Sequence, residues 1–230
     1  SSKGIRVMGV SPRIDNVTFS NNEVMNLLLM YSSSDVSDIT VIGGSYGLNV
    51  VGSDADISRV TVTGSSFGAL FQGMGGRARD FKAISCTQIG VYAYNASVST
   101  LDLELTDNTV GMRADNSTFI AENLSIKRGQ IGVQTTAGSN VLLVNSTMTD
   151  VSTLHYSAYG SSQIVARNVQ LSPAGAIDRE LQDDSTLVVQ NFLSVLVRSY
   201  DTGAVLSGAQ VDVTDNSTLI ATPSSRGDGI

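Results

Sequence analysis

The sequence is poor in several residue types, and each shortage excludes a class of protein or site. Its 230 residues include no Trp, 3 Pro, one Cys (Cys86) and only 15% charged residues. A single cysteine excludes an intrachain disulfide and any multi-cysteine metal site. No apolar run approaches the ~18 residues of a membrane-spanning helix, so we expect no membrane insertion in this fragment. A net charge of −7 provides no basic face, and nucleic acid is therefore not an expected partner.

The residues that are abundant form a repeat. Gly, Ser, Thr, Val, Asn and Asp predominate, as is typical of strands joined by turns. A phrase of one leading residue followed by apolar–polar alternation returns every 21 or 22 residues. Its nine copies begin at Gly4, Asn26, Gly47, Gly68, Gly90, Gly111, Gly132, Thr153 and Gly175. A second marker, Asp or Asn before an apolar residue, keeps the same period at Asn16, Asp38, Asp80, Asp102, Asn123, Asn168 and Asn191, with Arg59 and Asn145 in the slot imperfectly.

Two markers with one period predict an all-β solenoid. Alternation of period two indicates strands, and the intervening segments are too short for crossover helices. A unit of this length holds three short strands and three turns, which is one coil of a parallel β-helix. We expect about nine coils stacked ~4.8 Å apart in a rod roughly 40 Å long.

The alternation also predicts the core. The first residue after the leading position is apolar in every copy, and inward stacks are expected from Ile5, Leu27, Leu48, Ala69, Val91, Met112, Val133, Leu154 and Ala176. A second inward row runs from Val7 to Tyr156, and a third follows the Asp/Asn marker, from Val17/Phe19 to Leu124/Ile126. We interpret the leading Gly as a turn residue with positive φ, and the marker amides as a hydrogen-bonded ladder.

This repeat resembles the right-handed parallel β-helix of pectin-lyase-like proteins, including NosD-like repeat proteins of archaeal and bacterial surfaces. The resemblance covers residues 1–191 and specifies fold rather than activity. The rhythm stops after Asn191. Residues 192–230 resemble the opening of a carboxypeptidase-regulatory-like or Ig-like β-sandwich, and we expect them to form an incomplete second domain.

The outward positions of the first strand carry the candidate binding residues. Stacking places Tyr92, Arg113, Gln134 and His155 in one column, and Tyr94 and Asp115 in the next. Tyr rings pack on sugars, while Arg, Asp and Gln bind hydroxyls or carboxylates. In pectin-lyase-like enzymes this outer sheet often carries the substrate groove. The alternative is a solvated face on which these residues are ordinary cross-strand partners.

No catalytic residue, metal site or cofactor is predicted. Glycoside hydrolysis requires two carboxylates at roughly 5 to 9.5 Å, and Asp115 has no clear carboxylate neighbour. Lyase chemistry commonly uses Ca²⁺ held by clustered acids, and no such cluster lies on one face. His155, the only His, is interpreted as a surface residue of a strand.

Short motifs add modification sites. Of six N-x-S/T sequons, Asn95, Asn116 and Asn216 are the better glycan acceptors, because Asn16, Asn123 and Asn145 coincide with the ladder. Arg226-Gly227-Asp228 is interpreted as a hairpin turn rather than an integrin motif. Cys86 is interpreted as a partly buried small residue.

The leading hypothesis is a non-catalytic extracellular or cell-surface protein, such as an S-layer component or adhesin. In it the β-helix is a rigid rod with a glycan-binding face. Polysaccharide is then the expected partner, and further domains or neighbouring subunits should cover the ends of the coil. The alternatives are a polysaccharide lyase or hydrolase, a carbohydrate-binding relative of those enzymes, and a viral tail-fibre segment.

Overall fold

The computed structural model describes residues 3–20, 22–73, 75–172, 179–190, 213–215 and 218–221. By their internal contacts the residues divide into two units, Ser1–Asn191 and Phe192–Ile230. In the second unit the structure describes only an antiparallel pair, β22 (Val213–Asp215) and β23 (Thr218–Ala221). The predicted sandwich, the Arg226-Gly227-Asp228 motif and the sequon at Asn216 otherwise lie outside the described residues.

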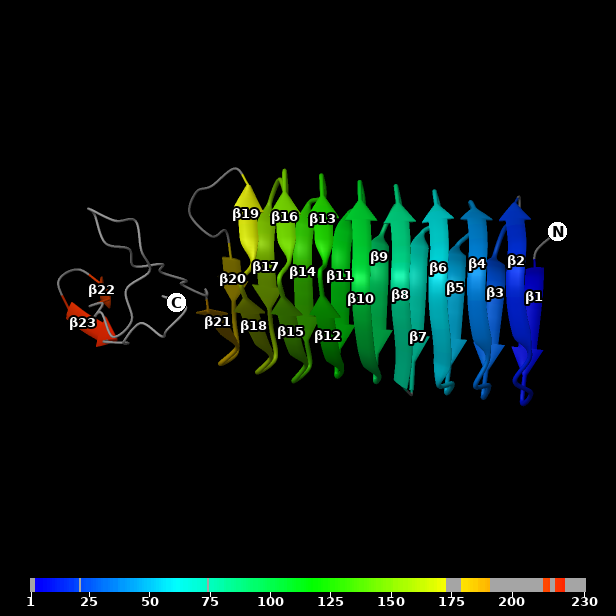
Figure 1. Ribbon diagram of the computed structural model, residues 1–230, viewed down its shortest axis with the longest axis horizontal. Coiled ribbons are helices and arrows are strands. Elements are labelled where there is room, and N and C mark those ends of the chain that lie inside the picture. Colours follow the sequence, from blue (N-terminus) through cyan, green and yellow to red (C-terminus); the bar gives the residue numbers. More distant parts are fainter. Residues whose placement is uncertain are drawn as a thin grey trace, which may run out of the picture. The chain divides into compact units, whose positions relative to one another are not determined.

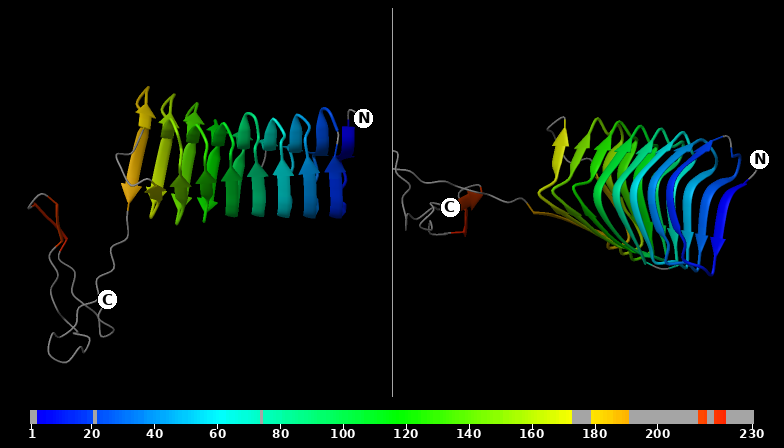
Figure 2. Two further views of the ribbon diagram at one scale, coloured as in Figure 1. Left: turned by 90° about the horizontal axis from the view of Figure 1, so that it is seen from above. Right: turned by 45° about the vertical axis from the view of Figure 1, so that its right-hand side comes forward.

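The first unit is an all-β parallel solenoid of about eight turns, which confirms the predicted fold class. Its first sheet contains β1 (Lys3–Met8), β3 (Met25–Met30), β5 (Tyr46–Val51), β7 (Phe67–Gln72), β9 (Ile89–Tyr94), β11 (Val110–Asp115), β14 (Ile131–Thr136), β17 (Leu154–Ala158) and β20 (Arg179–Leu181). Its second sheet contains β2 (Arg13–Ser20), β4 (Asp35–Ile42), β6 (Ala55–Thr63), β8 (Gly75–Ile84), β10 (Ser97–Thr106), β12 (Thr118–Glu122), β15 (Asn140–Val144), β18 (Gln163–Arg167) and β21 (Thr186–Gln190), with β13 (Ser125–Lys127), β16 (Thr147–Thr149) and β19 (Gln170–Ser172) beside them. Successive coils stack in one row (Figures 1 and 2).

The strand registers confirm the predicted inward rows through most of the solenoid. Val91 pairs with Met112 and Met112 with Val133, and all three side chains are at most 1% exposed. The row after the Asp/Asn marker is buried from Ile39 to Ile126. A further inward row, not among those predicted, comes from the second sheet and includes Ala55, Val98, Phe119, Val141 and Ile164.

The register differs from the prediction after Gly132. Gly132 aligns with His155, because Val133 pairs with Tyr156 and Thr135 with Ala158. The inward residues of β17 are therefore Tyr156 and Ala158, two positions further along than predicted. The next expected phrase, which begins at Gly175, lies outside the described residues.

The leading glycines have a different role from the one predicted. None of Gly4, Gly47, Gly68, Gly90, Gly111 and Gly132 has positive φ. Each lies where an added Cβ would collide with the backbone of the next coil, at 2.4 Å from the Gly90 carbonyl oxygen in the case of Gly68. Close approach of neighbouring coils, rather than a left-handed turn, explains why this position is Gly.

The Asp/Asn marker forms a corner with positive φ. Every residue in this slot from Asn16 to Asn168 has φ between 49° and 56°. Amide groups link neighbouring corners as predicted: Asn123 Nδ2 donates to Asp102 Oδ1 at 2.9 Å, and Asn168 Nδ2 donates to Asn145 Oδ1 at 2.8 Å. Arg59, the imperfect member, instead donates two hydrogen bonds to Asp38.

A buried serine ladder lines the corner between the first and second sheets. Ser117 Oγ accepts the Ala96 N–H at 3.0 Å, and Ser139 Oγ accepts the Ser117 N–H at 3.0 Å. The ladder continues through Ser162 and Ser185. Each of these buried amides would otherwise lack a partner at a corner where the β ladder is interrupted, so the hydroxyls substitute for backbone pairing.

Candidate functional site

The outward face of the first sheet brings together most of the predicted binding residues. Tyr92 pairs with Arg113 and Arg113 with Gln134, while Tyr94 pairs with Asp115. Strand pairing therefore places five of the six candidates on neighbouring coils, as the repeat predicts.

His155 is the exception, and the prediction that it extends the Gln134 column is wrong. Gln134 pairs with Ser157, whereas His155 occupies the position of Gly132 and is only 5% exposed. The interpretation of His155 as a surface residue is also wrong for this reason. The cause is the register difference at β17, which turns the imidazole into the interior.

Asp115 is the centre of a closed hydrogen-bond network. Arg113 Nη2 donates to Asp115 Oδ2 at 2.9 Å, and Arg113 Nε donates to Oδ1 at 3.1 Å. Tyr92 Oη donates to Oδ2 at 2.6 Å, and Thr136 Oγ1 donates to Oδ1. The Asp115 side chain is only 11% exposed. Its acceptor positions are occupied by neighbours on three coils, so the carboxylate is not available to a ligand.

The network also sets the ionisation of its members. Burial alone would raise the pKa of Asp115, but hydrogen bonds from Arg113, Thr136 and Tyr92 outweigh it and hold the pKa below its usual value. Burial would lower the pKa of Arg113, but Asp115 raises it overall. Burial and the bond to Asp115 raise the pKa of Tyr92 to about 12. At neutral pH Arg113 and Tyr92 keep their protons, and the ionised Asp115 is a weak proton acceptor because its pKa is lowered and both of its oxygens already accept hydrogen bonds.

Removing the Tyr92 hydroxyl tests this network. We expect Tyr92→Phe to lower the free energy of unfolding by about 1.5 kcal/mol at neutral pH, because Asp115 loses a charge-assisted hydrogen bond. The wild-type contribution is fully present below the unfolded tyrosine pKa of ~10 and is lost as pH rises toward about 12. The variant should therefore lose less stability across that interval, as measured by denaturant titrations at several pH values.

Tyr31→Phe is the matched control, because Tyr31 is 66% exposed and the change should stay within about 0.5 kcal/mol. Tyr156 is buried and also has a raised pKa, but it is present in all three proteins and cancels from the comparison. Identical alkaline profiles for wild type and Tyr92→Phe would contradict the assigned role of the hydroxyl.

Aromatic rings accompany the network along the first sheet. The Tyr46 and Phe67 rings stack at 5.1 Å between centroids, and Phe67 lies 6.3 Å from Tyr92. The Arg113 guanidinium lies 5.4 Å from the centre of the Tyr92 ring, and Tyr92 in turn contacts Tyr94 at 6.3 Å. The network thus fixes Tyr92, and Tyr92 supports Tyr94, whose side chain is 45% exposed.

Beside Tyr94 the corner of the coil is hollowed. A depression of about 390 Å³ is lined by Tyr31, Val51, Gly52, Gln72, Gly73, Tyr94 and Asn95, and we call it the tyrosine groove. Tyr31 was not predicted as a site residue, because it lies just beyond the aligned phrase. The available signal was its position, since Tyr31 is the one aromatic residue in a corner column that also contains Gly9, Gly52, Gly73, Asn95, Asn116 and Ala137.

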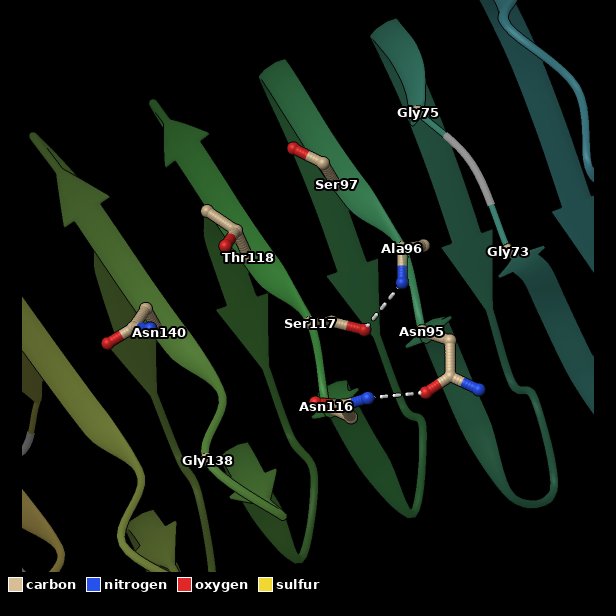
Figure 3. Close-up of a pocket in the computed structure, with 10 residues that line it drawn as sticks. All are labelled: Gly73, Gly75, Asn95, Ala96, Ser97, Asn116, Ser117, Thr118, Gly138 and Asn140. Carbon is tan, nitrogen blue, oxygen red and sulfur yellow. Dashed lines mark hydrogen bonds between the residues drawn. The ribbon is translucent and has the colours of Figure 1, made fainter.

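A second depression of about 390 Å³ shares Gly73 and Asn95 with the tyrosine groove and is lined by small polar side chains. Figure 3 shows Ser97, Thr118 and Asn140 on successive strands, with Asn116 donating to Asn95 at the corner. Both sequon residues, Asn95 and Asn116, are exposed and have positive φ. Their glycosylation remains a prediction.

The remaining candidates do not form a second site. Cys86 is 1% exposed, and burial raises its pKa to about 12, so its thiol is neither accessible nor ionised at neutral pH. Within the part of the chain that the structure describes, no three His, Cys, Asp or Glu side chains are grouped to hold a metal ion. The same residues contain no helix able to cross a membrane.

Comparison of the chain with protein-family models, curated proteins and solved structures found no significant match.

Proposed function

We propose that this chain is a non-catalytic structural or adhesive protein of the cell surface or extracellular space, in which the solenoid is a rigid rod with a glycan-binding face. The observation that carries the proposal is the uninterrupted register of the first sheet, from β1 to β20 over about eight turns. We further propose a relationship to pectin-lyase-like and NosD-like repeat proteins, and a sandwich module beginning near residue 192.

Rigidity follows from how neighbouring coils are joined. Two parallel sheets bond each described coil to the next, and the Asp/Asn ladder and the buried serine ladder add hydrogen bonds between some of the coils. Because a solenoid has only neighbour-to-neighbour contacts, such bonds at every step are what resist bending and local opening. A rod of this kind is suited to holding a recognition surface at a distance from its attachment.

The chemistry of the exposed face favours binding over catalysis. Asp115 and Arg113, the residues best placed for acid–base work, are paired with each other and held in their charged forms. Next to them, Tyr94 presents an exposed ring, which is the type of group that packs against sugars.

Polysaccharide binding without cleavage tests the proposal. We would incubate the purified chain with neutral polymers (hydroxyethyl cellulose, xylan, galactomannan) and acidic ones (polygalacturonate, alginate). Affinity electrophoresis measures binding, and reducing-end and unsaturated-uronate assays measure cleavage. We expect retardation by at least one polymer and no products. Cleavage that disappears in Asp115→Asn would instead support the lyase or hydrolase alternative, and absence of retardation by every polymer would contradict the glycan-binding role.

A further inference from the structure

We propose that the tyrosine groove binds an extended, uncharged polysaccharide, with Tyr31 and Tyr94 as two separate stacking platforms. This inference rests on the proposed glycan-binding function and assigns it to a specific place and ligand class. The place is not the Arg113–Asp115 cluster suggested by the sequence but the corner beside it.

Tyr31 has a backbone conformation that requires an explanation. Its φ is 51°, in the left-handed region, where the same corner of the next two coils has Gly52 and Gly73. A bulky residue in this region costs of order 1 kcal/mol or more, and Tyr31 is the only aromatic residue among the described residues with positive φ. The strained backbone here supports a ring that is 66% exposed and contributes little to the core.

Both rings are held in place although both are exposed. A Cβ added to Gly52 would lie 2.7 Å from Tyr31 Cε1, so the Tyr31 ring rests against the Gly52 backbone. The Tyr94 ring contacts Tyr92, whose hydroxyl is bonded to Asp115. Because fixed rings lose little conformational entropy when a ligand stacks on them, both are suited to binding.

The spacing of the platforms fits a chain rather than a single sugar. The Tyr31 corner is separated from the Tyr94–Asn95 corner by the Gly52 and Gly73 corners, so the two platforms are three strand steps apart. At ~4.8 Å per step the two corners lie roughly 14 Å apart along the solenoid, and the Tyr31 ring, which lies over Gly52 on the next coil, is about one step closer to Tyr94. One step is close to the length of a hexose, so a polymer running along the solenoid axis would place one ring on each tyrosine with further units between them.

The surface between the platforms is open at the backbone level. The Tyr31 ring covers Gly52, but Gly73 beside it is open, because an atom added there would meet nothing closer than 3.8 Å. A polymer can therefore lie close to the main chain between the two rings. Gln72 and Asn95 provide amides at the edge of this floor for sugar hydroxyls.

Asn95 joins the groove to the polar depression shown in Figure 3. Its Oδ1 accepts a hydrogen bond from Asn116 Nδ2 at 2.8 Å, while its own Nδ2 points away from Asn116. This nitrogen lies on the side of Asn95 nearer the coil of Gly73 and can donate to a sugar hydroxyl. Ser97 and Thr118 add hydroxyl groups on the adjoining strands.

Charge selects the ligand class. The residues that line the tyrosine groove include no Asp, Glu, Lys or Arg. The chain carries a net charge of −7, which disfavours acidic polymers at moderate ionic strength. Arg113, the nearest candidate for an acidic sugar, is already paired with Asp115. An uncharged, extended chain is the ligand that meets these conditions.

Affinity electrophoresis of the whole chain against the neutral polymers named above tests the inference. We expect Tyr31→Ala and Tyr94→Ala each to weaken binding about tenfold, because each removes one stacking platform. The Tyr31→Phe and Tyr94→Phe variants keep the rings and should bind within about twofold of wild type. Gln134→Ala, on the same face but outside the groove, is the matched control and should not change binding.

The outcomes separate this inference from the function on which it rests. Wild-type binding to neutral polymers that survives both Tyr→Ala changes, or is lost in Gln134→Ala instead, overturns the groove assignment and leaves the glycan-binding function standing. Binding only to the acidic polymers does the same. No binding to any polymer overturns both. Thermal unfolding of each variant guards against loss of fold, and both tyrosines are exposed enough that their replacement should leave the unfolding temperature within about 2 °C.

Discussion

Gly68→Ala is expected to lower the free energy of unfolding by about 3 kcal/mol. The new Cβ would lie 2.4 Å from the Gly90 carbonyl oxygen and 2.8 Å from Ala83 Cβ. Neither neighbour can rotate away, because one is backbone within a parallel sheet and the other is a buried methyl group. The strands β7 and β9 would have to separate, which disrupts the ladder between two coils. Denaturant titration of the purified variant measures the loss.

Gly138→Ala is the matched control for this prediction. Gly138 has φ of +74°, and an added Cβ would meet nothing within 4 Å, so the substitution introduces backbone strain without a collision. We expect it to cost about 1 kcal/mol, the usual penalty for an L-residue in the left-handed region. A cost for Gly138→Ala equal to or above that of Gly68→Ala would show that close approach of the coils is not what constrains the leading glycines.

Phe119→Ala is expected to destabilise the solenoid by about 4 kcal/mol, the largest effect among these substitutions. Phe119 lies on β12, is 0% exposed, and pairs with Val98 on one side and Val141 on the other. The core between two sheets cannot collapse into the space left by a phenyl ring, because hydrogen bonds between coils fix the strand spacing. The substitution therefore adds a cavity to the lost burial of the ring.

Ile120→Ala tests the register on which that prediction depends. Ile120 follows Phe119 but points outward and is 43% exposed, so its replacement should cost less than about 0.5 kcal/mol. Moving a strand by one residue exchanges its inward and outward side chains. If Ile120→Ala lowered the free energy of unfolding more than Phe119→Ala, then Ile120 would point inward and Phe119 outward, and the assigned core would be wrong.

The repeat was predictable because its cause is local. Each coil must alternate apolar and polar residues so that the apolar ones fill the interior. The same pattern must then recur after the number of residues in one coil. Those two conditions appear in the order of residues from Gly4 to Val133, and the structure places Leu27, Val91 and Met112 inside as the alternation predicts. The Asp/Asn corners were also predictable from the sequence, because these residues tolerate positive φ and recur at one position of the repeat.

The position of His155 was not predictable from alternation. A pattern of period two is unchanged by a shift of two residues, so Tyr156 faces inward in either register. Only the pairing of Val133 with Tyr156 decides between them, and it places His155 in the interior beside Gly132. This coil has no Gly at its start, so the first marker could not distinguish the two alignments, and the available signal was the 23-residue step of the second marker from Asn145 to Asn168.

The amino-acid sequence by itself determined the coiled architecture, most of three core rows and five of the six residues predicted on the outer face of the first sheet. The tertiary structure decided what those residues are free to do. From the sequence, Asp115 and Arg113 were expected to be free to bind a ligand. In the structure Asp115 accepts hydrogen bonds from Arg113 and from Tyr92 and Thr136 on neighbouring coils, and the network is closed. Tyr31 looked incidental, yet it lies with Tyr94 along one groove. The reason is physical: periodicity records which way a side chain faces, whereas its partners come from residues about 21 positions away, and only the packing of the coils brings them together.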